Sequence, residues 1–240
     1  MTTSNNLMQV LNLIATLFPV FLLVFTFKGF FQALAAKLMG DSTAEDEGFL
    51  TLNPLAHVDI AGLSIVLIVF FLLGALLGEK IPRGILFIML ITLGVRWTIP
   101  VPINDNNFKN YRLGGILTAL SGSLGNFVLA FCATLAIKAV FACGFPRYAL
   151  VSLLEILKSL MSVAIFFGLL DLIPLPPFDG GRILHYVLPY SQQHIVAWLE
   201  QYALYILLIL FFAPGVSTLF LNGIATLGSL IEHLFFLIVF

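Results

Sequence analysis

The sequence predicts an all-α fold: a polytopic membrane helix bundle of about six transmembrane helices, with an extra short or re-entrant segment. Three observations predict this class. The 240 residues are 60 % hydrophobic and only 10 % charged, whereas a soluble domain is about a quarter charged. The mean hydropathy is +1.09. Several apolar runs approach the roughly 20 helical residues that cross the hydrocarbon core of a bilayer. We expect one membrane-embedded domain covering residues 1–240.

Six apolar runs are expected to cross the membrane. They are, in order, residues 7–39, 62–77, 116–141, 150–172, 195–212 and 216–240. The run 85–95 is short for a full span, which predicts a tilted or re-entrant segment. Pro174 and the prolines that follow it end the fourth span, because proline cannot continue a helix. Two stretches with polar residues, 40–60 and 96–114, are expected to be connections, and the second reads as an exposed loop.

Charge limits the partners that this chain can have. The formal net charge is −1, which argues against a nucleic-acid partner, because such a partner favours a basic face. The distribution of Lys and Arg over the loops gives only a faint bias towards one orientation in the membrane. We expect an integral, multi-pass protein of a cell (plasma) membrane, with lipid and a transmembrane protein segment as its partners.

Four short motifs occur in one order along the chain. They are Gly40–Thr43 (GDST), Thr51–Asp59 (TLNPLAHVD), Gly122–Asn126 (GSLGN) and Pro174–Leu184 (PLPPFDGGRIL). In residues and order these motifs resemble the site-2 protease family, the zinc metalloproteases that cut peptides inside the bilayer. The resemblance covers about residues 26–184. It implies a helical membrane fold, with zinc as the family cofactor.

The metal-binding motif of that family is replaced in this chain. A helical His-Glu-x-x-His places two zinc ligands on one helix face, with a general base between them. The resemblance puts Lys28 and Gln32 at the two His positions, Gly29 at the Glu position and Asp179 at the third ligand. A charged ammonium has no lone pair, a neutral amide is a poor zinc ligand, and glycine cannot accept a proton. We therefore expect no bound metal and no intact catalytic residue.

Substrate positioning is also altered relative to the family. The resemblance implies this role for Asn126, Asn53 and Asp171, but a family proline is Ser123 here and a family asparagine is Asp171. A second interpretation is structural. Asn53 and Asn126 would then satisfy backbone groups, and Asp171 would face water at the end of its helix.

Lys28 requires an explanation because a charge within a spanning helix is costly, roughly 2.5 to 3.5 kcal/mol at its centre. One interpretation is that its ammonium reaches the interface while its stem lies on apolar surface. The other is an ion pair between Lys28 and Asp179 in the former metal site. For Asp179 the alternative interpretation is structural: it would be a turn residue that follows the prolines. A new metal site built from His57, Asp59 and Asp179 is a further alternative.

These observations favour a catalytically inactive, site-2 protease-like membrane protein that binds a transmembrane segment or a membrane partner. Three alternatives remain open. One is an active intramembrane metalloprotease with a non-standard site. Another is a hydrolase in which Lys28 is the general base for Ser121 or Ser123. The third is a transporter or channel, because charges inside a membrane often mark ion paths. The charges in question are Lys28, Lys158, Asp171 and Asp179.

Overall fold

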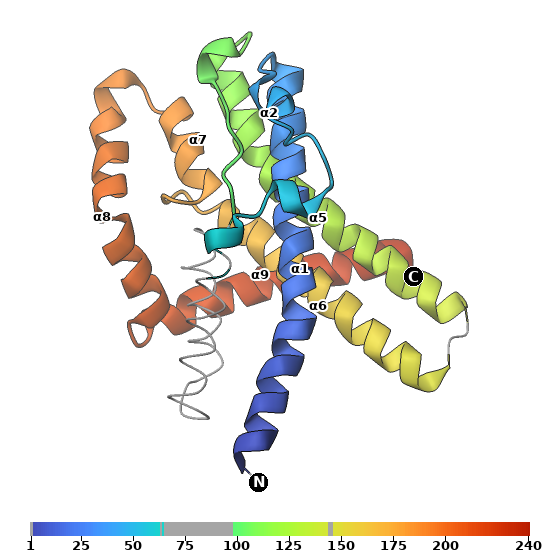
Figure 1. Ribbon diagram of the computed structural model, residues 1–240. Helices are drawn as coiled ribbons and strands as arrows, with labels where there is room; N and C mark the ends of the chain where they lie inside the picture. The colour runs from blue at the N-terminus through green and yellow to red at the C-terminus, as the bar shows by residue number, and fades with distance from the viewer. Residues whose placement is uncertain (1, 63, 65–97, 144–145) are drawn as a thin grey trace.

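The computed structural model describes residues 2–62, 64, 98–143 and 146–240 (Figure 1). Their regular structure is helical, which confirms the all-α prediction. The helices are α1 (Thr2–Met39), α2 (Thr43–Asp46), α5 (Tyr111–Ala142), α6 (Arg147–Asp171), α7 (Asp179–Val187), α8 (Gln193–Phe212) and α9 (Val216–Val239). Three 3-10 helices are η1 (Pro54–Ala56), η3 (Asp105–Asn107) and η4 (Tyr190–Gln192).

Five segments within the described residues are long and apolar enough to cross a membrane, so the chain is a multi-pass membrane protein. They are Thr16–Met39, Tyr111–Ala142, Leu150–Asp171, Tyr190–Phe212 and Val216–Val239. These correspond to five of the six spans that the sequence predicts. The span predicted at 62–77 and the re-entrant segment predicted at 85–95 lie almost entirely outside the described residues.

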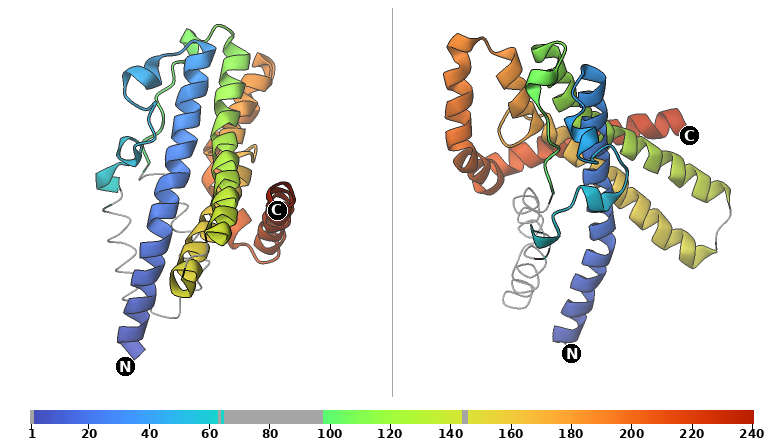
Figure 2. Two further views of the ribbon diagram at one scale, coloured as in Figure 1. Left: turned by 90° about the vertical axis from the view of Figure 1, so that its right-hand side faces the viewer. Right: turned by 45° about the horizontal axis from the view of Figure 1, so that its top comes forward.

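The centre of the molecule is formed by α1, α5 and α6, which pack against one another (Figure 1, Figure 2). Their shared core contains Val24 of α1, Ala133 of α5 and Ile165 of α6, all buried. The close approach of α1 and α5 depends on Gly125, because a Cβ there would lie 2.8 Å from the carbonyl oxygen of Phe27. Small residues at a membrane helix crossing permit such contact between backbones. The polar side chains of α1 are thereby held close to the face of α5.

Many residues of the segment 98–110 are exposed, in agreement with the loop predicted at 96–114, and the segment is also docked on α1, where Lys109 N donates to Met39 O at 3.0 Å. Helix α5 begins at Tyr111, where the Asn110 side chain accepts a hydrogen bond from Leu113 N at 3.1 Å. Phe108 is buried, and Ile99 N donates to His57 O at 2.9 Å. Asn104 and Asn110 satisfy backbone groups of this segment, while Lys109 is exposed.

Asp41 holds the two polar connections together. Its carboxylate accepts hydrogen bonds from Asn104 N at 2.8 Å, from Asn107 Nδ2 at 2.8 Å and from the hydroxyl and amide of Thr43. Burial alone would raise the pKa of Asp41, but the hydrogen bonds outweigh burial and lower it below its usual value. The end of α1 and the segment before α5 are therefore fixed relative to each other.

Candidate functional site

A charged cluster lies where α1, the end of α6 and the start of α7 meet. Lys28 Nζ is 2.6 Å from Asp171 Oδ1 and 2.9 Å from Asp179 Oδ2. Gln32, one turn along α1, donates from Nε2 to the same Asp179 oxygen at 2.9 Å. Only 21 % of the Lys28 side chain is exposed, against 6 % for Asp171 and 7 % for Asp179. The structure thus brings Lys28 and Asp179 together and adds Asp171 to them.

Arg182 adds a second cation to this cluster. Its Nη1 lies 3.7 Å from Asp179 Oδ1, one helical turn along α7. With every group ionised, two cations then face two carboxylates, and the four charges balance. A buried charge is tolerated only when it is paired in this way. This geometry disagrees with the interpretation in which the Lys28 ammonium reaches the membrane–water interface. The ammonium is instead held between two carboxylates.

Asp171 does not face water, which corrects that interpretation of the sequence. It is the last residue of α6, and it is 4 % exposed. Its Oδ1 accepts the hydrogen bond from Lys28, while its Oδ2 has no partner among the residues that the structure describes. Lys28 is therefore the partner on which this carboxylate depends.

The proline-rich turn places Asp179 at the start of a helix rather than in a turn. A loop of residues 172–178 follows Asp171, and α7 begins at Asp179. The close packing of α7 on the start of this loop needs glycine at the next position, because a Cβ on Gly180 would lie 2.3 Å from Ile173 O. The sequence analysis did not predict α7, whose nine residues are too short for a spanning pattern.

Gly122 of α5 forms the wall of the charged cluster. A Cβ at this position would lie 2.9 Å from Gln32 Nε2 and 3.1 Å from Asp179 Oδ2. Such distances are shorter than ordinary van der Waals contact, so the backbone of α5 already touches the polar groups. This close wall leaves little unfilled space beside Asp179.

His57 occupies the place that a side chain at position 29 would need. A Cβ on Gly29 would lie 2.4 Å from His57 Nδ1. The His57 ring is 2 % exposed, and its Nε2 is 3.0 Å from Thr51 O. Because a carbonyl oxygen only accepts, Nε2 carries the proton and Nδ1 has a free lone pair. Burial lowers the pKa of His57, which favours this neutral ring.

The remaining predicted site residues are placed apart or are engaged elsewhere. Asn53 is exposed and accepts from Leu55 N at 3.1 Å, as a structural cap. Asp59 accepts from Ala61 N at 3.0 Å. Asn126 is fully buried, and within the described part of the chain neither atom of its amide has a hydrogen-bond partner. Ser121 donates to Thr118 O at 2.7 Å, so its hydroxyl is used within its own helix.

The residues of the cluster do not fit a zinc ion. Zinc sites use nitrogen, sulfur or oxygen lone pairs, commonly from three protein side chains with one open position. Here the ammonium of Lys28 and the amide nitrogen of Gln32 face the carboxylates as hydrogen-bond donors. Across the described ranges there is no group of three or more His, Cys, Asp or Glu side chains that could hold a metal. This includes the alternative set of His57, Asp59 and Asp179.

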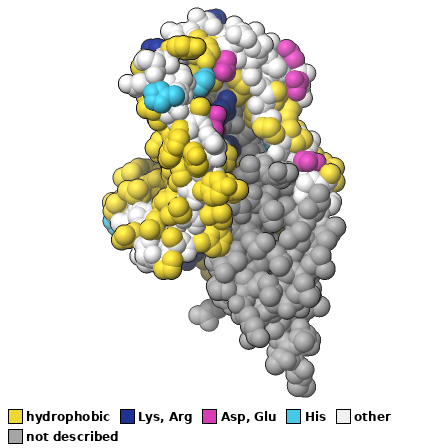
Figure 3. Space-filling view, turned by 90° about the vertical axis from the view of Figure 1, so that its left-hand side faces the viewer, with side chains coloured by type: hydrophobic (Ala, Val, Ile, Leu, Met, Phe, Trp, Pro, Cys, Tyr) yellow, Lys and Arg dark blue, Asp and Glu magenta, His cyan; other side chains and the backbone are white. Residues whose placement is uncertain are grey.

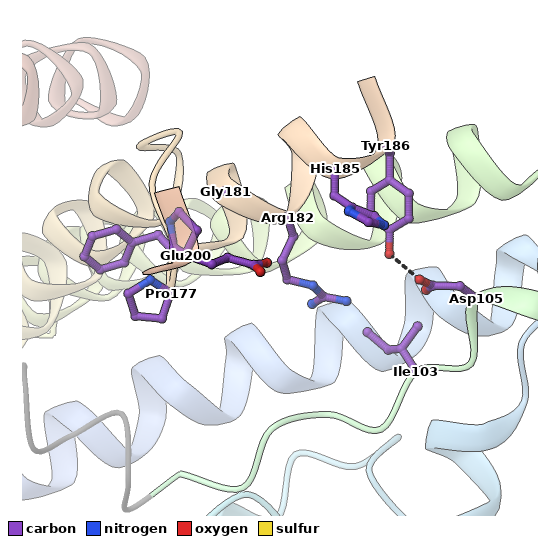
Figure 4. Close-up of a pocket in the computed structure, with 10 residues that line it drawn as sticks. Ile103, Asp105, Pro177, Gly181, Arg182, His185, Tyr186 and Glu200 are labelled. Carbon is purple, nitrogen blue, oxygen red and sulfur yellow. Dashed lines mark hydrogen bonds between the residues drawn. The ribbon is translucent and has the colours of Figure 1, made fainter. Parts of the chain in front are cut away.

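A pocket of about 410 Å³ lies beside α7, and Arg182, which also contacts Asp179 of the cluster, forms part of its wall (Figure 4). It is lined by Ile103, Asp105, Pro176, Pro177, Phe178, Gly181, Arg182, His185, Tyr186 and Glu200. Tyr186 donates its hydroxyl to Asp105 Oδ2 at 2.8 Å. Burial and this hydrogen bond raise the pKa of Tyr186 to about 12. Sequence analysis missed the pocket, although Arg182, His185 and Tyr186 of its lining have the spacing of one helix face.

Comparison with known proteins gave one informative relative. The chain is 29 % identical over 206 residues to a Bacillus subtilis (strain 168) protein named "Putative zinc metalloprotease YwhC". The match covers 85 % of this chain and 83 % of the relative. No family model matches the chain. No solved structure matches it either.

Proposed function

We propose that this chain is a site-2 protease-like membrane protein that binds a transmembrane segment or a membrane partner without cutting it; its likeness to a "Putative zinc metalloprotease" and its five apolar helices support this. It would act in a cell membrane as a pseudoprotease. The observation that carries this proposal is the position of Lys28, whose ammonium contacts both Asp171 and Asp179. A monovalent cation from the protein itself takes the place beside Asp179 that the family resemblance gives to a metal dication.

The surroundings of Gly29 support the same proposal. Zinc proteases of this kind need a general base to take a proton from the attacking water. Gly29 has no side chain, and the ring of His57 fills the space where one would begin. His57 also cannot replace the missing base from there, because its free Nδ1 is buried against the backbone of α1. Lost catalytic groups and a filled site both favour binding over hydrolysis.

An exposed stripe on α5 supports a helical binding partner. Leu113, Leu117, Leu120 and Leu124 repeat at intervals of four, three and four residues, and between 38 % and 55 % of each is exposed. This spacing places them on one face of the helix, in the pattern with which two helices pack together. A transmembrane segment laid along α5 would cover this stripe, on the face of the helix opposite Gly122 and the charged cluster.

The test combines metal content, cleavage and crosslinking. The protein is purified in detergent, its zinc is measured, and it is incubated with reporter proteins that carry single transmembrane segments. We expect zinc well below one ion per chain, intact reporters, and crosslinks from a photoreactive residue placed at Leu120. The control has the same residue at Leu219 of α9, which is also exposed. Near one zinc per chain, with cleavage that a chelator abolishes, would overturn the proposal.

Two further outcomes would favour the alternative functions. Ion flux through liposomes that contain the protein, lost on Lys28→Met, would support a transporter or channel. Covalent labelling of Ser121 or Ser123 by a serine-directed probe would support a hydrolase. Equal crosslinking from Leu120 and Leu219 would refute a binding face on α5.

A further inference from the structure

The pocket beside α7 carries charges of both signs on apolar walls. Arg182 of α7 supplies a guanidinium, Glu200 of α8 and Asp105 supply carboxylates, and Ile103 and Phe178 supply apolar surface. In Figure 4 the guanidinium of Arg182 lies between the carboxylates of Glu200 and Asp105. Figure 3 shows Lys/Arg and Asp/Glu side chains gathered at a recess bordered by apolar side chains. These features describe a site for a small dipolar group, and the proposed function does not use it.

We infer that this pocket binds the head group of a zwitterionic phospholipid that carries a primary ammonium, as in phosphatidylethanolamine. A guanidinium fits two oxygens of a phosphodiester with parallel hydrogen bonds. A primary ammonium has three donors, which a carboxylate such as that of Glu200 accepts. An anionic head group would meet the carboxylates of Glu200 and Asp105, and a purely cationic ligand would meet Arg182. The alternating charges therefore select a ligand with one charge of each sign.

The depth of the pocket also suits a head group. Glu200 lies in the spanning segment Tyr190–Phe212, between Trp198 and Tyr202. These two aromatic side chains are 53 % and 38 % exposed, and exposed Trp and Tyr gather where a membrane meets water. The uninterrupted apolar run of α8 begins only after Tyr202, at residues 203–212, so Glu200 and the two aromatic side chains mark the polar end of this run, where a head group would lie.

Below Glu200, α8 offers a path for an acyl chain. Leu204, Leu208 and Phe212 follow at intervals of one helical turn, and they are 61 %, 45 % and 46 % exposed. Residues four apart lie on one face of a helix, so this apolar ridge continues from the face that carries Glu200. A lipid with its head group in the pocket would lay a chain along the ridge.

The test measures lipid binding to the full chain by native mass spectrometry. The purified protein is offered phosphatidylethanolamine, phosphatidylcholine and phosphatidylglycerol with identical acyl chains, and also water-soluble phosphoethanolamine. We expect phosphatidylethanolamine to bind about tenfold more tightly than the other two lipids, the effect of one charge-assisted hydrogen bond. Phosphoethanolamine alone should bind far more weakly, because it lacks the chains that contact α8.

Matched variants separate this site from general lipid binding. Glu200→Gln should abolish the preference for phosphatidylethanolamine over phosphatidylcholine, while Glu155→Gln, at an exposed carboxylate of α6 outside the pocket, should retain it. Arg182→Gln should weaken all three lipids, and Arg182→Lys should recover part of the binding. Equal binding of the three lipids would overturn the inference. So would an unchanged preference in a folded Glu200→Gln protein, or tight binding of phosphoethanolamine alone.

Discussion

Replacing Lys28 by methionine should destabilise the protein by about 3–5 kcal/mol, the usual cost of removing one partner from a buried ion pair. Methionine keeps much of the length of the stem and removes the ammonium. The effect should be large because the side chains of Asp171 and Asp179 are only 6 % and 7 % exposed. Both carboxylates lose a contact shorter than 3 Å, and water cannot easily replace it.

The loss of the Lys28 ammonium should destabilise Asp171 more than Asp179. Asp179 keeps the hydrogen bond from Gln32 at 2.9 Å and the guanidinium of Arg182 at 3.7 Å. Asp171 keeps neither, and its second oxygen already has no partner among the described residues. Asp171→Asn should therefore restore most of the stability lost in Lys28→Met, and Asp179→Asn should restore little. We expect a coupling of at least about 1 kcal/mol between positions 28 and 171.

The assay is a double-mutant cycle on the free energy of unfolding, measured by steric trapping in lipid–detergent bicelles. Lys109→Met, at an exposed lysine before α5, is the control and should change stability by less than about 0.5 kcal/mol. Additive effects of the substitutions at 28 and 171, within about 0.5 kcal/mol, would refute the reasoning. Greater rescue by Asp179→Asn than by Asp171→Asn would show that the wrong carboxylate was assigned to Lys28.

Three other predictions concern the packing and the pH response of the chain. Gly29→Glu should lower thermal stability, and His57→Gly in the same protein should recover part of it, because the new Cβ would lie 2.4 Å from Nδ1; an unperturbed melting curve for Gly29→Glu would contradict this. Gly122→Leu should cost about 1–3 kcal/mol by overpacking, measured as a shift of the unfolding midpoint, and a neutral result would show that the wall of α5 can move. The pKa of Tyr186 is raised from 10.0 to about 12 by burial and by its hydrogen bond to Asp105. Its contribution to stability should therefore be complete below pH 10 and lost as the pH rises towards 12. Melting curves of Tyr186→Phe should lack this alkaline step, and an identical step in both proteins would assign it to another group.

The sequence by itself determined the class of fold and most of the spans. Apolar runs near 20 residues report on burial in lipid, and this property depends on local composition alone. The runs 150–172 and 195–212 accordingly agree with α6 and α8 to within a few residues. The absence of His and Glu at positions 28, 29 and 32 was also readable directly, because the chemistry of a donor or acceptor belongs to the residue type.

The tertiary structure decided which groups meet. Lys28 and Asp171 are 143 positions apart, and no periodicity in the sequence reports a contact between them. The ring of His57 against Gly29 and the pocket between α7 and α8 depend in the same way on how distant segments dock. Such contacts follow from the shape of packed side chains and from the pairing of buried charges, which the whole chain sets together. Hydropathy places each helix in the membrane, and long-range packing determines what the polar groups between the helices can do.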